Sequence, residues 1–306
     1  MSKTKQFSIL ITTRNRKDDL TFTLEKIKHL IDRKEVECII CDDGSTDGTY
    51  DFLHEKYQGI QLIKNKRCIG LIASRNLLLN RTTAQYAISL DDDAHFLTEN
   101  NLDKIENYFD KNPTCGVLAL RIFWGLSLPE NTISKQESQH VKGFVGCGHV
   151  WNMKAWKDIP NYPDWFEFYG EEDFAAFQLF KKDWEIHYLP DVLVHHRVDI
   201  KARKDNNDYS WRLRRSLRSG WYLYLLFYPW NVIPRKLAYT LWIQLKTKVF
   251  KGDWKAGIAI IQALFDVLWN IPKLLKNANR LTSEEFEKFQ KLPETKLYWD
   301  PSGNEI

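Results

Sequence analysis

Cysteine is scarce in this chain. Its 306 residues include five cysteines, an odd number that excludes a fully paired disulfide scaffold. Cys38 and Cys41 form a C-x-x-C pair inside an apolar run that reads as a strand. Strand positions three apart face opposite sides, so this pair cannot share a metal ion. We expect reduced, inert thiols, which favours a cytoplasmic protein.

Long apolar runs are also rare. The longest continuous one that stands out, 221–230, is too short to cross a bilayer. Residues 1–6 are polar and do not resemble a signal peptide. With only 14 glycines and 10 prolines, the composition is that of a globular protein rather than a fibrous or disordered one. We therefore expect at most a peripheral association with the inner face of the cell membrane.

Positive charge is concentrated in one region. Residues 197–255 contain 14 Lys or Arg but only four acidic residues, and aromatic residues alternate with the basic ones. This pattern suits an anionic membrane surface or a phosphate-bearing acceptor. A solvated helix face remains an alternative. No nucleic-acid partner is expected, because no helix-turn-helix, zinc-finger or RNA-binding signature accompanies the charge.

Strand and helix patterns alternate along the first hundred residues. The expected strands are 7–12, 36–41, 60–63 and 86–90, and the expected helices are 18–30, 47–57 and 71–80. Such alternation predicts βαβ units and an α/β fold with a mostly parallel central sheet flanked by helices. We expect one α/β domain over 1–198, with a nucleotide half at 1–97 and an acceptor half at 98–198. A helical, basic and aromatic region follows at 199–306.

Polar loops follow the first two expected strands. Thr12 and Arg14 come after the first strand, and the stretch Asp42-Asp43-Gly44-Ser45 comes after the second. Ligands of open α/β sheets bind beyond the carboxyl ends of the strands, and a carboxylate there can accept the N3–H of a uracil or thymine ring. A calcium loop or a plain turn is the alternative for the second loop, although the EF-hand pattern is incomplete.

Three carboxylates, Asp91, Asp92 and Asp93, follow the strand at 86–90. Adjacent carboxylates at the end of a buried strand repel one another, so a positive charge is expected to compensate them. Mg²⁺ or Mn²⁺ takes one or two carboxylates together with phosphate oxygens. A solvated acidic turn is the alternative.

A second acidic run comprises Glu171, Glu172 and Asp173. A carboxylate in a cleft can serve as the general base that removes a proton from an attacking hydroxyl. Glu172 and Asp173 are the candidates for this base, and Glu171 is a candidate for acceptor contact. The alternative is that all three complement the dipole of the helix expected after them.

Taken in order, these motifs resemble those of the inverting glycosyltransferases of family 2, which have the GT-A fold and build bacterial surface polysaccharides. The resemblance covers about residues 7–197. It implies a nucleotide-sugar donor, Mn²⁺ or Mg²⁺ on a D-x-D-type motif, and one carboxylate as the base. It implies that the nucleotide is bound by residues at the ends of the strands and by Arg75 of the stretch Ala73-Ser74-Arg75-Asn76. These residues are Thr12, Arg14, Asp43, Arg75, Asp91 and Asp92.

The resemblance also implies roles for later residues. Asp93, Asp91 and His196 would hold the metal ion, with Asp93 the direct ligand. Gly146, Gly148 and Trp151 would lie near the donor sugar and acceptor. The family has Asp where this chain has Glu in the acidic run, which leaves the base open between Glu172 and Asp173.

The predicted function is transfer of a sugar, with inversion, from a UDP- or dTDP-sugar to a hydroxyl of a glycan or lipid-linked glycan. One alternative is a sugar-phosphate nucleotidyltransferase, but the loop after the first strand lacks the glycines that such an enzyme uses to bind phosphate. Another is a glycan-binding protein without turnover. Against it, a site that has lost its chemistry has no reason to keep so many carboxylates.

Overall fold

A computed structural model describes residues 5–198 and 208–300. Its centre is a nine-stranded sheet with the order β3-β2-β1-β4-β8-β6-β9-β5, and β7 pairs with β9 beside this path. The strands are β1 (Phe7–Thr13), β2 (Val36–Asp42), β3 (Gln61–Lys64), β4 (Tyr86–Asp91), β5 (Ala94–Phe96), β6 (Cys115–Trp124), β7 (Gln139–His140), β8 (Gly148–Asn152) and β9 (Glu185–His196).

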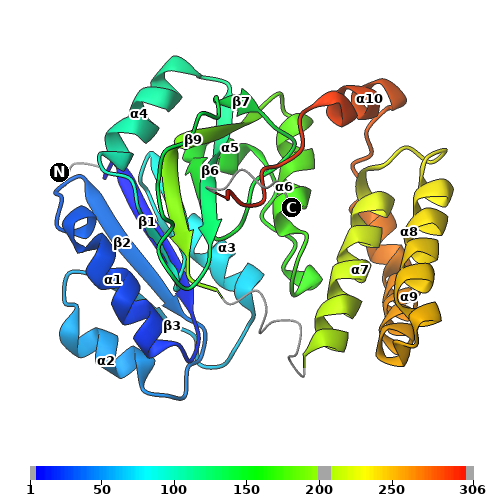
Figure 1. Ribbon diagram of the computed structural model, residues 1–306, viewed down its shortest axis with the longest axis horizontal. Helices are drawn as coiled ribbons and strands as arrows, with labels where there is room; N and C mark the ends of the chain where they lie inside the picture. Colours follow the sequence, from blue (N-terminus) through cyan, green and yellow to red (C-terminus); the bar gives the residue numbers. More distant parts are fainter. Residues whose placement is uncertain (1–4, 199–207, 301–306) are drawn as a thin grey trace.

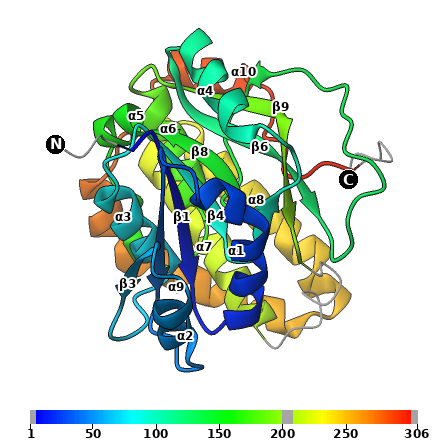
Figure 2. The same ribbon diagram turned by 90° about the vertical axis from the view of Figure 1, so that its left-hand side faces the viewer.

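Helices cover both faces of this sheet (Figures 1 and 2). One face packs against α1 (Lys17–Ile31), α2 (Thr49–Lys56) and α4 (Asn101–Lys111). The other packs against α3 (Leu71–Arg81), α5 (Met153–Asp158) and α6 (Glu171–Phe180). Cys38 lies in the first of these cores and Cys41 in the second, as the strand periodicity predicted. The mixed α/β fold expected from the sequence is confirmed.

The parallel strands bring the polar loops to one edge. In β1 and β2, Thr13 lies beside Asp42, and in β1 and β4, Thr12 lies beside Asp91. The strand β5, which begins directly after Asp93, pairs with β9 so that Ala94 lies beside His196 at the end of β9. The residues that follow β1, β2, β4 and β9 therefore meet at a single rim of the sheet.

Three long helices form the opposite end of the molecule (Figure 1). They are α7 (Tyr209–Phe227), α8 (Ile233–Thr247) and α9 (Trp254–Lys276). Ala256, Ala259 and Ala263 of α9 are fully buried, and their small side chains let α9 approach the helices beside it closely. We call residues 208–292 the helical half and residues 5–198 the sheet half.

The helix α9 corrects one expectation from the sequence. By length and composition alone, α9 is long and apolar enough to cross a membrane. Its most apolar 18-residue segment has a mean hydropathy of 1.5, and 22% of that segment is buried in the protein. It is longer than the run at 221–230, which was expected to be the longest apolar segment. Lys255 and Asp266 interrupt the apolar letters of α9, so the sequence does not display it as one continuous run.

The end of the chain returns to the sheet half. After α10 (Ser283–Lys291), the backbone N–H of Lys142 donates to the carbonyl of Pro293, and the guanidinium of Arg121 lies 4.4 Å from the ring centre of Trp299. Residues on both sides of the expected boundary at 198 therefore contact one another.

Sequence patterns missed β8 and α5, which lie in a stretch rich in glycine and tryptophan. The strand β8 runs antiparallel between β4 and β6, and Gly148 within it leaves no room for a side chain: an added Cβ would lie 2.9 Å from Ile122 Cδ1. A strand that begins with a packing glycine carries little strand signal of its own.

Candidate active site

The three consecutive aspartates after β4 point in different directions. Asp91 and Asp93 lie on one side with His196, and single ligand atoms of these three residues lie within 4.8 Å of one another. Asp92 points the other way and accepts a hydrogen bond of 2.8 Å from the Thr13 hydroxyl. Burial, together with the carboxylates beside it, raises the pKa of Asp92 to about 7. The structure therefore makes Asp92 an internal support of the rim, although the sequence suggested it as a nucleotide contact.

The side chains of Asp91, Asp93 and His196 fit a divalent cation, and we call these three residues the metal-type group. Asp93 is 2% exposed, and His196 Nε2 lies 3.0 Å from Asp93 Oδ1 and 3.7 Å from Asp91 Oδ2. Asp93 Oδ1 is nevertheless buried without a well-aligned hydrogen bond from the described residues. Two carboxylates and one imidazole that converge in this way form an O,N ligand set suited to Mn²⁺ or Mg²⁺.

The charge of His196 reflects this crowding. Burial lowers its pKa, but the neighbouring Cys147 and Asp93 outweigh burial and raise the pKa to about 10. The imidazole therefore carries a proton when no cation is bound. Metal ligation requires neutral imidazole, so binding of a cation would release that proton.

Arg16 is a part of the site that the sequence did not reveal. Its Nη2 lies 2.7 Å from Asp93 Oδ2, and its Nε lies 3.4 Å from Asp92 Oδ1. Two basic residues, Arg14 and Arg16, follow β1, and the sequence gives no means of telling which one turns toward the acidic residues. Arg16 supplies the positive charge that the buried aspartates need when no metal is present.

Arg75 joins the two acidic groups. Its Nη2 donates to Asp91 Oδ1 at 2.9 Å, and its Nη1 donates to Glu171 Oε1 at 2.9 Å and to Glu172 Oε1 at 3.3 Å. Nη2 also donates to the carbonyl of Gly146. Arg75 is 7% exposed, so its guanidinium holds the metal-type group and the acidic run together. The sequence predicted that Arg75 lies near the phosphates. In the structure its guanidinium contacts the carboxylates of Asp91, Glu171 and Glu172.

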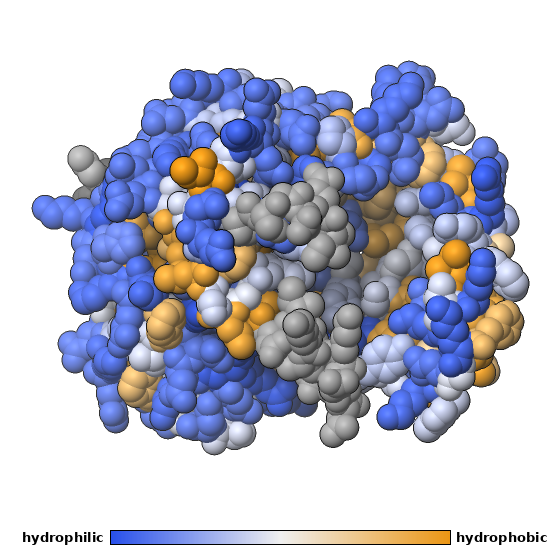
Figure 3. All heavy atoms as spheres, viewed as in Figure 1, coloured by the Kyte–Doolittle hydropathy of each residue, from blue (hydrophilic) through white to orange (hydrophobic). Residues whose placement is uncertain are grey.

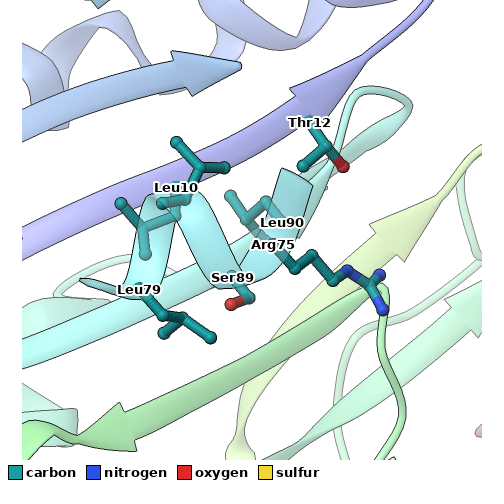
Figure 4. A pocket seen from close by; sticks show the side chains of 7 residues that line it. Leu10, Thr12, Arg75, Leu79, Ser89 and Leu90 are labelled. Carbon is teal, nitrogen blue, oxygen red and sulfur yellow. The ribbon is translucent and has the colours of Figure 1, made fainter. Parts of the chain in front are cut away.

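Figure 4 shows the base of this arrangement. The stem of Arg75 leaves α3 beside Leu10, Leu79 and Ser89, and its guanidinium points away from these side chains. The cavity around the stem measures about 10 Å³, which is close to the least volume that one water molecule needs. Substrates therefore cannot enter here, and this cavity serves only to position Arg75.

The acidic run forms the first turn of α6. Gly170 precedes it with a φ of 86°, a left-handed conformation that glycine adopts without strain. Glu171 is 2% exposed, and burial, together with the adjacent Glu172, raises its pKa to about 8 despite the contact with Arg75. The helix dipole favours negative charge here, which was the structural alternative to a catalytic role.

Glu172 and Asp173 face different surroundings. The side chain of Glu172 is 21% exposed and lies against Arg75. Asp173 is exposed, and the carboxylates of Glu172 and Glu294 lie near it. Glu172 thus faces the metal-type group, whereas Asp173 faces the returning end of the chain.

Gly146 and Trp151 have structural explanations. A Cβ at Gly146 would overlap the Glu172 carboxylate and lie 2.8 Å from Arg75 Nη1, so only glycine permits this approach. Trp151 is 0% exposed, and its indole N–H donates to the Tyr162 hydroxyl. The expectation that Trp151 contacts a sugar is corrected: its ring lies in the core.

The three residues expected at the nucleoside lie at the same rim. Thr12 is half-buried and Arg14 is exposed. Asp43 is 5% exposed and accepts hydrogen bonds from the backbone N–H groups of Ile69 and Gly70, at 2.8 and 2.9 Å. Burial raises the pKa of Asp43, but these bonds outweigh burial and bring it below its ordinary value. Asp43 is therefore ionised and anchors the loop before α3.

His149 is a second residue that the sequence did not reveal. It is fully buried beneath the site, and burial, together with the charge of Arg75, lowers its pKa to about 3. Its Nδ1 lies 3.1 Å from the carbonyl oxygen of Val145. A neutral imidazole under Arg75 leaves that guanidinium as the positive charge between Asp91 and Glu171.

Known proteins resemble this chain in sequence or in fold. A glucosyltransferase from Escherichia coli, UDP-Glc:alpha-D-GlcNAc-diphosphoundecaprenol beta-1,3-glucosyltransferase WfaP, is 38% identical over 92 residues. The match covers 30% of this chain and 36% of WfaP, so the chain spans about a third of that relative.

Two solved structures share the fold. GalNAc-T7 with UDP, GalNAc and Mn²⁺ superposes with a TM-score of 0.60 at 12% identity, over 89% of this chain and 58% of that one. The mannosyltransferase PcManGT from Pyrobaculum calidifontis, in complex with GDP-Man and Mn²⁺, gives 0.55 at 14% identity, over 89% and 76%. Finally, the model of glycosyl transferase family 2 matches residues 8–185, more than half of the chain. The chain therefore belongs to glycosyl transferase family 2.

Proposed function

We propose that this protein transfers a sugar, with inversion, from a nucleoside diphosphate sugar to a hydroxyl of a glycan or lipid-linked glycan, with Mn²⁺ or Mg²⁺ as cofactor. One observation carries the proposal. A single buried guanidinium, that of Arg75, contacts Asp91 of the metal-type group and Glu172 of the acidic run. The groups needed to neutralise a leaving diphosphate and to deprotonate an acceptor are thus neighbours.

Asp91, Asp93 and His196 are the residues that would hold the cation. A divalent ion at this place supplies positive charge to the diphosphate as it departs. Thr12, Arg14 and Asp43 lie along the same rim, where the nucleoside of the donor would bind.

Glu172 is the better candidate for the base. It would accept the proton of the acceptor hydroxyl as the new bond forms to the anomeric carbon, while the bond to the diphosphate oxygen breaks and the nucleoside diphosphate leaves. Attack from the face opposite the leaving group inverts the anomeric centre. Because Arg75 contacts Glu172 as well as Glu171, it holds the Glu172 carboxylate in position.

The donor and acceptor follow from the relatives. WfaP uses a UDP-sugar and an acceptor linked to diphosphoundecaprenol, and GalNAc-T7 binds UDP. For this chain we infer a UDP- or dTDP-sugar as the donor and a lipid-linked glycan as the acceptor. Such an acceptor lies at a membrane, so the enzyme needs to reach a membrane surface.

The helical half offers a face that suits this need. Phe265, Leu268 and Trp269 of α9 are 67%, 61% and 88% exposed, and Trp242 of α8 is 53% exposed. Figure 3 shows some hydrophobic residues among hydrophilic ones at the right-hand end of the molecule, where the helical half lies. An apolar face of this kind, in a region with many lysines, favours contact with an anionic cytoplasmic leaflet. Since the other side of α9 packs within the helical half, we infer that α9 lies on the membrane rather than across it.

The test has two steps. Thermal melting is measured first with UDP, dTDP or GDP, with and without Mn²⁺, because a ligand that binds through the metal stabilises the fold by mass action. The matching nucleotide sugars are then supplied with a prenyl-diphosphate sugar, and the anomeric configuration of the product is read by NMR. We expect stabilisation that requires the metal and a product of inverted configuration.

The rival functions give other outcomes. A nucleotidyltransferase would release pyrophosphate from a nucleoside triphosphate and a sugar phosphate, and a glycan-binding protein would bind without turnover. Transfer that continues unchanged in the presence of a chelator would contradict the metal-dependent mechanism.

A further inference from the structure

A second recess lies between the helical half and the sheet half, and its lining includes no member of the metal-type group. It is enclosed by α7, α9 and the short helix η1 (Asp164–Phe166), and its volume is about 300 Å³, within the range of small-ligand sites. Its walls carry arginines, aromatic rings and two carboxylates, among them Arg214, Arg215, Arg218, Trp211, Glu167 and Asp266.

The charges of this arginine recess are only partly balanced. Arg214 makes a two-pronged ion pair with Asp266, with N–O distances of 2.7 and 2.6 Å. Arg215 and Arg218 share the carboxylate of Glu167, and Arg218 also lies 3.8 Å from Asp266 Oδ2 and donates to the carbonyl of Phe166. Three arginines thus face two carboxylates, which leaves one positive charge in a partly enclosed space.

Two donors in the recess have no partner among the described residues. Arg218 is 5% exposed, and its Nε is buried without a hydrogen bond, as is Nη1 of Arg215. Buried polar groups are almost always hydrogen-bonded, so an orphaned guanidinium nitrogen points to an absent acceptor. The guanidinium of Arg215 is also held in place by stacking, 3.6 Å from the ring centre of Trp211.

The recess adjoins both the apolar face and the acidic run. Asp266 and Asn270 line it, and on α9 each follows an exposed apolar residue, Phe265 and Trp269, by one position. Glu167 is five residues before Glu172, so their backbones are at most roughly 18 Å apart. A ligand in the recess would therefore lie between the membrane-facing surface and the candidate base.

We propose that the arginine recess binds a phosphate group of the acceptor's lipid diphosphate. Arginine forks match phosphate oxygens, and the Arg214, Arg215 and Arg218 guanidinium groups line the recess with one positive charge more than its two carboxylates balance. The lipid chain would leave along Phe265 and Trp269, and the acceptor sugar would extend toward Glu172. This inference rests on the proposed function, because it names the site for the acceptor's anionic part.

The test compares two acceptors that carry the same sugar, one on a short prenyl diphosphate and one on a neutral alkyl chain. Arg215→Ala is expected to raise KM for the diphosphate acceptor about tenfold, the effect of losing one charge-assisted hydrogen bond. Its kcat, its KM for the neutral acceptor and its hydrolysis of the donor are expected to stay at the wild-type values. Arg215→Lys, which keeps the charge, is expected to recover part of the affinity.

Arg212→Ala is the matched control, since it removes the same charge from the same helix, where Arg212 pairs with Asp208. It is expected to leave the diphosphate KM near wild type. An equal rise of KM for both acceptors in Arg215→Ala, or no rise at all, would overturn the proposal.

Two further arms separate the sources of phosphate and the two proposals. If Arg215→Ala loses flotation with phosphatidylglycerol vesicles but keeps its KM for the soluble diphosphate acceptor, the recess binds lipid headgroups and the assignment to the acceptor is wrong. If the wild type neither transfers nor hydrolyses any donor, the proposed function fails. Calorimetry with farnesyl diphosphate then tests the recess alone: tight binding to the wild type and weak binding to Arg215→Ala support it, and equal binding rejects it.

Discussion

The sheet half and the helical half handle charge and apolar surface in opposite ways. Burial raises the pKa of two carboxyl groups, those of Asp92 and Glu171, and both lie in the sheet half. The helical half instead gathers exposed apolar side chains along one helix, α9, where Phe265 is 67% and Trp269 88% exposed. Burying charge and exposing apolar surface both cost free energy, so each half retains a feature that folding alone would not favour.

This difference separates chemistry from location. Buried carboxylates around Arg75 form an environment able to bind a cation and hold a base, while exposed rings on α9 form a surface able to bind lipid. If the separation holds, changes in one half impair one property and spare the other. The predictions below test it, beginning with the largest effect.

Removing the Asp93 carboxylate is expected to have the largest effect. Asp93→Ala deletes a buried member of the metal-type group, and the loss of several kcal/mol of charge stabilisation lowers kcat on the order of 10⁴-fold. Metal-dependent thermal stabilisation by the nucleoside diphosphate is expected to disappear as well. Vesicle flotation is expected to remain, because it belongs to the helical half.

Asp92→Asn provides the matched control. Asp92 is the adjacent carboxylate and is also buried, but it accepts a hydrogen bond from Thr13 and is not a member of the metal-type group. Its variant is expected to retain stabilisation by Mn²⁺ and nucleotide. If Asp92→Asn loses this response and Asp93→Ala retains it, the cation site is misassigned.

The sequence predicted much of this rim and little of what lies behind it. Strand ends can be located from apolar runs, and parallel strands bring their ends together, which is why Asp91 and Asp93 were expected at this rim. His196 was named through the resemblance to family 2, and the structure brings it beside both aspartates. The direction of a long side chain depends on packing. The sequence therefore predicted Arg75 near the phosphates but did not predict that its guanidinium joins the Asp91 and Glu171 carboxylates.

Glu172→Gln is expected to have the next largest effect. The amide keeps the size of the side chain but cannot accept the acceptor's proton, so transfer falls about 10³-fold while donor binding stays near wild type. Single-turnover transfer and calorimetry with the donor measure the two quantities separately.

Asp173→Asn sharpens this result. Asp173 neighbours Glu172 in the chain but lies toward Glu294, and the ion pairs that Arg75 makes with described residues do not include it. A loss of transfer larger in Asp173→Asn than in Glu172→Gln would make Asp173 the base.

Removing apolar surface from α9 tests the other half. The double variant Phe265→Ser, Trp269→Ser takes away two exposed rings, and burial of one such side chain contributes about 2 kcal/mol. The fraction bound to anionic vesicles is expected to fall roughly tenfold to a hundredfold, as measured by flotation, with unchanged kcat on a soluble acceptor. Leu126→Ser, Leu128→Ser removes two leucines of similar exposure from the sheet half and is expected to float like the wild type.

The smallest effect concerns the stability of the sheet half and the protonation of Glu171. Its folded pKa of about 8 lies above the ordinary value, so the stabilisation from its proton is complete at low pH and is lost as the pH rises toward and through 8. Glu171→Gln keeps an acceptor for Arg75 and does not titrate. The melting temperature of the wild type, relative to Glu171→Gln in metal-free buffer, is therefore expected to fall by a few degrees between about pH 5 and pH 9.

Glu185→Gln is the control. Hydrogen bonds from Thr114 and His187 lower the pKa of Glu185, so its contribution is already complete above its ordinary pKa, and the difference from wild type stays flat over this range. A flat difference for Glu171→Gln as well would show that Arg75 keeps Glu171 ionised, and the acidic run would then hold one more negative charge beside the candidate base.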